Sequence, residues 1–168
     1  MAHLVLSVVG DDRAGLVNAL ADAVAAHGGN WERSELTELA GAFAGIVLVS
    51  VADDRADELT SALHELDGLL RVTTHSGTVG AAPAAQTLSF TVLGNDRPGI
   101  VRDVTSAVSA HALSIESFTS RTLDAPMAGG TLFEATVTVR VPETGDATPI
   151  VAALERLADE IQVDLSVS

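Results

Sequence analysis

The chain has 168 residues, 47% of them hydrophobic, so a packed core is expected, and its net charge of −14 argues against binding to nucleic-acid phosphates or anionic membranes. It contains neither cysteine nor lysine, which excludes disulfides, thiol nucleophiles, cysteine-ligated metals and Schiff-base chemistry. No apolar run approaches the roughly 20 residues of a membrane-spanning helix, and no basic signal-peptide region precedes the first strand, so we expect a cytoplasmic protein.

The first half of the chain begins with a strand and a helix. Residues 3–9 predict a strand with Leu4, Leu6 and Val8 on one face, and a turn of Gly, Asp and Arg residues follows at 10–15. The next side chains recur at helical spacing, which predicts an amphipathic helix. They are Leu16, Leu20, Ala23, Val24 and His27.

Two strands, a second helix and a closing strand complete this half. Residues 31–36 predict a polar strand, which suits a sheet edge, and Val47, Val49 and Val51 mark an apolar strand. The second helix carries Leu59, Leu63 and Leu66, and residues 72–79 form the closing strand.

The second half of the chain repeats the first. Residues 94–111 match residues 10–27 at nine of eighteen positions with a constant offset of 84, which indicates a duplication. Strands are expected at 87–93, 114–122, 133–141 and 161–167. Helices are expected from Ile100 and from Thr148-Pro149, a cap followed by a first-turn proline.

Both halves therefore have the order βαββαβ. This order predicts an α+β protein of two tandem ferredoxin-like domains, each a four-stranded antiparallel sheet with two helices on one face. We expect domain 1 at residues 1–80, a small, uncharged linker at 81–86 and domain 2 at 87–168.

The turn between the first strand and the first helix is the most informative segment of each copy. A helix N-terminus presents unpaired backbone amides and a partial positive charge, so an anion can bind there without a lysine. Gly15 and Gly99 leave room for a small ligand near the backbone. The alternative is purely structural, with Asp12 and Asp96 serving as N-caps and the glycines allowing a tight corner.

A βαββαβ unit with the turn NDRPGI, found at residues 95–100, resembles the ACT domain, although copy one has Ala14 where copy two has Pro98. Two such units in tandem resemble the glycine cleavage system transcriptional repressor family. The resemblance implies an amino acid bound between paired domains, contacted by the turn and by the start of the second strand. It implicates Asp11, Asp12, Gly15, Leu16 and Asn30 in copy one, and Asn95, Asp96, Gly99, Ile100 and Ser114 in copy two.

Other residues have structural readings that we favour. His27 and His111 recur at the end of the first helix, where a cation is stabilised, although a ligand or metal contact is the alternative. The remaining histidines lack metal-type spacing, so we expect no metal site and no cofactor. Trp31 is expected to pack rather than to line a cleft, and the acidic residues at 53–58 to begin the second helix and face solvent or a basic partner protein.

The leading hypothesis is a regulatory protein without catalytic activity, since we find no nucleophile–base pair. It would bind an amino acid such as glycine or serine, form a dimer and act through a partner protein on amino-acid or one-carbon metabolism. A ligand-free dimerisation or scaffold module is the main alternative. An enzyme is a weaker alternative, and so is an RNA-binding βαββαβ domain, because the chain has few aromatic and basic residues to display on an open sheet.

Overall fold

The computed structural model describes residues 1–78, 85–111, 113–124, 129–142, 148–149, 152–153 and 161–167. The chain divides into two compact units, Met1–Gly80 and Ala81–Ser168. The predicted linker at 81–86 lies mostly outside the described residues, which resume at Ala85 within a strand.

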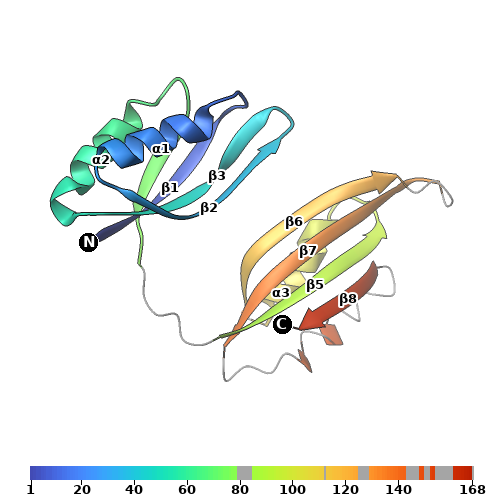
Figure 1. Ribbon diagram of the computed structural model, residues 1–168. Coiled ribbons are helices and arrows are strands. Elements are labelled where there is room, and N and C mark those ends of the chain that lie inside the picture. The colour runs from blue at the N-terminus through green and yellow to red at the C-terminus, as the bar shows by residue number, and fades with distance from the viewer. Residues whose placement is uncertain are drawn as a thin grey trace. The chain divides into compact units, whose positions relative to one another are not determined.

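Unit 1 is a four-stranded antiparallel sheet with two helices on one face (Figure 1). Its strands have the order β2-β3-β1-β4 across the sheet. The elements in chain order are β1 (Ala2–Asp11), α1 (Leu16–Ala26), β2 (Asn30–Leu39), β3 (Ala42–Val51), a short 3-10 helix (Asp53–Arg55), α2 (Ala56–His64) and β4 (Arg71–Ser76). This arrangement confirms the predicted ferredoxin-like fold.

The core of unit 1 lies between the sheet and its helices. Period-two alternation puts Leu6, Val8, Val47, Val49 and Val51 on the helix-facing side of β1 and β3. The predicted helical stripe supplies Leu16, Leu20 and Val24 from α1, with Leu59 and Leu63 from α2. The polar strand β2 is an edge strand, as its sequence predicts, and Trp31 packs against the core.

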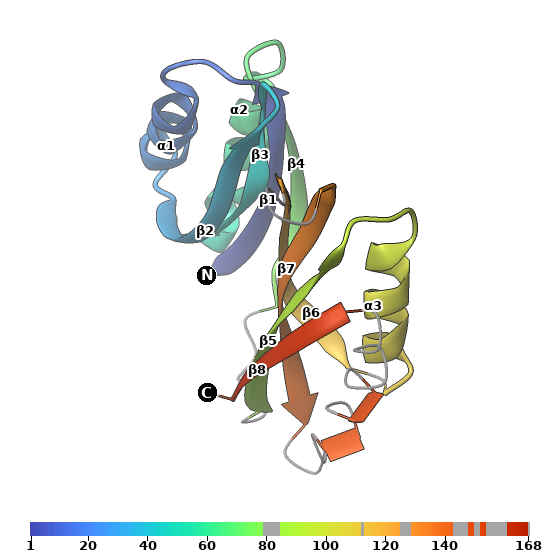
Figure 2. The ribbon, with the colours of Figure 1, turned by 90° about the vertical axis from the view of Figure 1, so that its right-hand side faces the viewer.

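Unit 2 has the same sheet topology, with the order β6-β7-β5-β8 (Figure 1), and α3 lies on one face of this sheet (Figure 2). Its elements are β5 (Ala85–Asn95), α3 (Ile100–Ser109), β6 (Ser114–Asp124), β7 (Thr131–Pro142) and β8 (Ile161–Val167). Ile100, Val104 and Val108 of α3 pack on Phe90, Val137 and other core residues of the sheet. The predicted second helix lies largely outside the described residues, of which 148–149 and 152–153 are helical.

Across the described residues, no helix combines the length and the hydropathy that crossing a bilayer demands.

Candidate functional site

Each strand-to-helix turn ends on a glycine in the left-handed region. Gly15 has φ +91° and is the N-cap of α1, and Gly99 has φ +88° and is the N-cap of α3. A side chain at this conformation costs about 1–2 kcal/mol, which explains why both copies place glycine here. Asp12 and Asp96 are therefore not the N-caps that their residue type suggested, because each helix begins only after the glycine and has no side-chain cap.

The two turns are held to the sheet in the same way. The amide of Asp12 donates to the carbonyl of Gly41 at 2.9 Å, and the amide of Asp96 donates to the carbonyl of Thr131 at 2.8 Å. Both acceptors lie at the hairpin between the second and third strands of their unit. The turn backbone is thus fixed, while the side chains of Asp11, Asp12, Asn95 and Asp96 are exposed.

The surroundings of the two turn glycines differ. No heavy atom other than immediate neighbours lies within 4 Å of the position that a Cβ would occupy at Gly15, so this side of the turn is open. At Gly99 the same position lies 3.4 Å from Nη2 of Arg102. Copy one therefore leaves open space at the helix start, whereas copy two places a guanidinium beside it.

The turn arginines, which the repeat conserves between copies, have different partners. Arg13 donates to the carbonyls of Gly68 and Leu69 at 2.9 and 3.2 Å, and so ties the turn to the loop before β4. Arg97 instead donates to Asp103 on α3 at 2.8 Å. Their identity in the repeat is the only signal in the sequence that could have pointed to these arginines, and it does not predict their different partners.

Asp103 is the centre of a small ionic cluster at the start of α3. Its carboxylate accepts from Arg97 through one oxygen and from Arg102 through the other, at 2.8 and 3.3 Å. The hydrogen bond from Arg97 is the main cause that holds the pKa of the Asp103 carboxyl below its ordinary value. Copy one has Ala19 at this position and Asn18 in place of Arg102, so it has no equivalent cluster.

Leu16 and Ile100 contribute to the turns only through their backbone. Their side chains are buried in the two cores, with exposed fractions of 2% and 3%. The amide of Ile100 donates to the carbonyl of Arg97 at 3.3 Å within the turn. Any contact that these two residues make with a polar ligand must therefore come from main-chain atoms.

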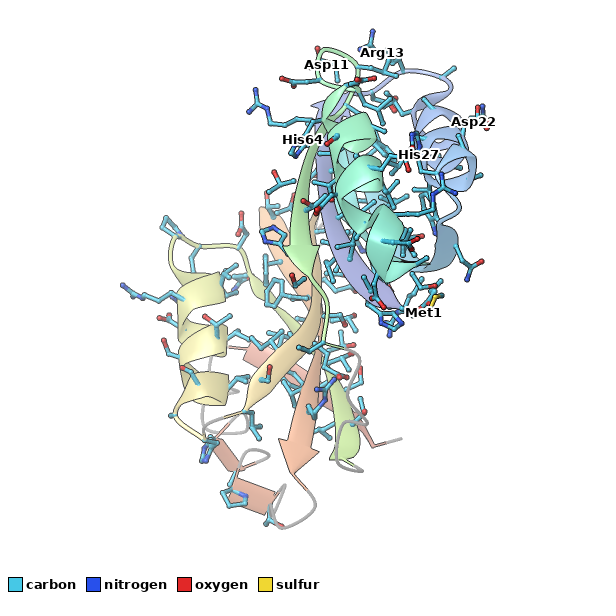
Figure 3. All side chains as sticks on the ribbon, turned by 90° about the vertical axis from the view of Figure 1, so that its left-hand side faces the viewer. Met1, Asp11, Arg13, Asp22, His27 and His64 are labelled. Carbon is cyan, nitrogen blue, oxygen red and sulfur yellow. The ribbon has the colours of Figure 1, made fainter. Side chains whose placement is uncertain are left out.

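Asn30 and the turn of unit 1 lie at opposite ends of the sheet. Asn30 pairs with Ser50, which pairs with His3, whereas Asp11 pairs with Ala42 at the far end of β1. The eight residue-to-residue steps from His3 to Asp11 span roughly 26 Å along the strand. Figure 3 shows Asp11 and Arg13 together at one end of unit 1 and Met1 at the other.

Unit 2 separates its predicted residues in the same way. Ser114 pairs with Arg140, which pairs with Thr87 near the beginning of β5, whereas Asn95 pairs with Leu132 at the end of β5. Both Asn30 and Ser114 are exposed. Within each unit the turn and the predicted second-strand residue are too far apart to contact one small ligand, so the predicted site residues of a unit form two separate groups, which we call half-sites.

The histidines at the helix ends have structural partners. His27 is the C-cap of α1, and its Nδ1 donates to the carbonyl of Ala23 at 2.8 Å, which satisfies an end-of-helix acceptor. His111 follows the C-cap of α3, and its amide donates to the carbonyl of Val108. Over the described part of the chain, no three His, Cys, Asp or Glu side chains are grouped to hold a metal ion.

Comparisons with known proteins match both units to one family. A family model described as an ACT domain matches residues 2–76, and a second model of the same description matches residues 89–159. The chain is 28% identical to the glycine cleavage system transcriptional repressor of Escherichia coli K12, over 99% of this chain and 89% of that protein, and the Shigella flexneri repressor gives the same values. A crystal structure of an unknown protein from Galdieria sulphuraria is 31% identical, with a TM-score of 0.88 over 99% of this chain and 98% of that one.

Proposed function

This chain belongs to the ACT-domain family, and from that membership we propose that it is a non-catalytic cytoplasmic regulator that binds an amino acid between paired ACT units. Its relationship to a glycine cleavage system transcriptional repressor supports a role in amino-acid or one-carbon metabolism, exerted through a partner protein. The observation that carries the proposal is the doubled turn, in which a left-handed glycine leaves a helix start exposed at the end of the first strand.

The ligand groups that fit this turn are those of an α-amino acid. First-turn amides have no preceding helical turn to bond to, so those of α1, and those of α3 that follow Ile100, whose own amide bonds to Arg97, favour a carboxylate. Oxygen atoms of Asp11, Asn95 or Asn30 accept hydrogen bonds from the ammonium group. Glycine and serine are the first ligands to test, because a small side chain fits next to exposed backbone.

The separation of the half-sites determines how the ligand is held. A free amino acid is far shorter than the roughly 26 Å between the turn and Asn30 of one unit. A ligand that contacts both must therefore join the turn of one unit to the second strand of another. Binding then depends on how two units are paired, and a ligand that prefers one pairing shifts the population toward it.

The two copies are expected to bind unequally. Copy two has Ser114 where copy one has Asn30, and a shorter side chain reaches less far toward an ammonium group. The side of Gly99 is also occupied by Arg102, whereas Gly15 is open. We expect the turn of copy one to contribute more of the affinity.

A thermal-shift and calorimetric screen of the twenty amino acids and of folate-related metabolites tests the proposal. A ligand present at 100 times its Kd raises the unfolding free energy by about 2.7 kcal/mol. Gly15→Ala should weaken binding of the responding compound at least about tenfold, because the added methyl group enters the open space beside the helix start. A tenfold rise in Kd corresponds to a loss of about 1.4 kcal/mol of binding free energy.

Gly129→Ala is the matched control for that variant. Gly129 also has a left-handed φ, of +66°, and open space at its Cβ position, so the substitution introduces a similar backbone strain outside the turn of copy one. It should leave the ligand affinity unchanged. A failure of every compound to stabilise the chain would favour a ligand-free dimerisation module, and a robust turnover of any of them would contradict the non-catalytic assignment.

A further inference from the structure

The sheet of unit 1 has an apolar face that no described element of the unit covers. Both helices pack on the other face (Figure 1). The strand registers place three rows of side chains across the open face, centred on Val5, Ser7 and Val9 of β1. Leu48, Ile46 and Ala44 of β3 lie next to them in the same rows. Ile46 is 51% exposed and Val9 is 45% exposed.

The fold does not require this apolar character. In unit 2 the same registers place Ser89, Thr91, Thr136 and Thr138 at the positions of Val5, Ser7, Ile46 and Leu48. The hydroxyl groups of Ser89 and Thr138 lie 3.4 Å apart, and Arg121 pairs with Glu134. Leu93 keeps an apolar side chain at the position of Val9, but Glu134 replaces Ala44 beside it. Unit 2 therefore shows that this sheet folds with a mostly polar face, and the apolar centre of the face of unit 1 needs another explanation.

The charges around the face of unit 1 also differ from the rest of the unit. Residues 1–80 contain 4 arginines and 12 acidic residues, a net charge of −8. The three rows contain Arg33, Arg71 and only one carboxylate, Glu35, which gives a local charge of +1. A second acidic copy of the chain meets little electrostatic repulsion at this surface.

We propose that the open face of unit 1 is a homodimer interface, in which it packs against the same face of a second copy. Of the two open sheet faces of the chain, this apolar one is its own best complement, and a twofold interface joins identical patches. A twofold axis along the strands lays the β2 edge of one copy over the β4 edge of the other. That arrangement lays the row of Glu35 in one copy over the row of Thr73 in the other, so that Arg71 lies two residues, roughly 7 Å, farther along β4.

The size of the face suffices for such a dimer. β1, β2 and β3 have 10 residues each and β4 has 6, so at about 4.8 Å between strands and about 3.3 Å per residue the face covers roughly 570 Å² in projection. Each partner of a standard protein interface buries about 800 Å² of accessible surface, which includes the relief of the side chains, so the face is of the size that a small dimer interface needs. The proposal specifies the surface of the self-association expected for an ACT-domain regulator, but its test needs no amino acid and is therefore independent of ligand binding.

Sedimentation equilibrium of the full chain tests the interface. The variant is Ile46→Thr with Leu48→Thr, which installs the residues found at the same register in unit 2. Each change acts twice across a twofold axis, so we expect the dimer Kd to rise at least about tenfold from the lost apolar contact. Val17→Thr on α1 is the control, because Val17 is 44% exposed and lies off the face. A wild-type chain that is monomeric up to about 100 μM, or a dimer that the double variant does not weaken, overturns the proposal.

Cross-linking provides a second readout if the double variant does not fold. The chain contains no cysteine, so Ser7→Cys introduces a single thiol in the middle row of the face. A short bismaleimide should link two Ser7→Cys chains and should not link two Val17→Cys chains. Equal cross-linking of both variants, or none with Ser7→Cys, contradicts the interface.

Discussion

At the scale of single residues, the arginine at the same position of the two turns makes different contacts in each copy. Arg13 bonds to main-chain carbonyls of the loop before β4, and Arg97 bonds to a carboxylate of its own helix. The difference follows from the chain itself, because copy two offers Asp103 where copy one has Ala19. The same turn conformation is therefore maintained by a different set of polar contacts in each copy.

The ionic cluster of copy two predicts a pH dependence. Because the pKa of Asp103 is lowered in the folded state, the unfolded state binds more protons as the pH falls toward the ordinary value of 3.8. The contribution of Asp103 to stability is present above that value and is lost as the pH falls through the lower, folded-state pKa. Asp103→Asn should flatten the acid side of the stability profile, measured as the urea unfolding free energy from about pH 6 to about pH 2.

Asp57→Asn is the control for this prediction. Asp57 lies in the first turn of α2, as Asp103 lies in the first turn of α3. Asp57 is exposed, and among the described contacts it forms no ion pair with an arginine. If both variants flatten the acid side of the profile equally, the Arg97–Asp103 hydrogen bond is not the cause of the pH dependence of the unfolding free energy.

At the scale of secondary-structure elements, the pairing of β2 with β3 depends on one glycine. A Cβ at Gly45 would lie 2.0 Å from the carbonyl oxygen of Glu35 and 2.8 Å from Cα of Leu36. Both atoms belong to the backbone of the neighbouring strand, so they cannot rotate away. The edge strand that begins at Asn30 is thus held by a close backbone contact rather than by side-chain packing alone.

Gly45→Ala should lower the unfolding free energy by about 2–3 kcal/mol, because the added methyl group forces the two strands apart. Urea denaturation monitored by the fluorescence of Trp31, the single tryptophan of the chain, reports this loss within unit 1. Gly41→Ala is a useful comparison, since no atom lies within 4 Å of its Cβ position and only the left-handed φ opposes the change. A smaller loss for Gly45→Ala than for Gly41→Ala would be inconsistent with the contact.

Local patterns predicted most of the elements, and their errors have physical causes. Burial on one face of an element produces a regular spacing of apolar residues, which can be read directly from the sequence. This is true of the helical stripe of Leu16, Leu20 and Val24 and of the alternation in β3. β2 continues to Leu39, beyond its predicted end, because pairing with β3 extends it, and pairing is not a local property. The N-caps were wrong because a preference for Asp at helix starts ignored the backbone conformation that glycine allows.

The candidate site was predictable in its parts and not in its geometry. The repeat located the turn residues, and the family resemblance added Asn30 and Ser114. Their separation follows from topology, because the crossover helix makes β1 and β2 parallel and puts their first residues at the same end of the sheet. The partners of Arg13 and Arg97 could not be predicted, since they depend on loops brought together only by folding.

At the scale of the whole molecule, the chain consists of two related units with different surfaces. Unit 1 has an open turn glycine and an open sheet face with an apolar centre, while unit 2 has a turn beside Arg102 and a mostly polar sheet face. The two copies share one fold, and their turns and sheet faces have diverged. We assign to unit 1 the stronger ligand contacts at its turn and the self-association at its sheet.

The central claim is that a ligand joins the turn of one unit to the second strand of another, and ¹⁵N-resolved NMR of the full chain tests it most directly. During titration with an amino acid that stabilises the chain, the amides of Gly15 and Leu16 in the turn and the amide of Asn30 or Ser114 at the start of a second strand should shift along one common binding curve, although roughly 26 Å separates the turn from the second-strand residue within one unit. Shifts confined to one of these two places, or to neither, would contradict a site built from both.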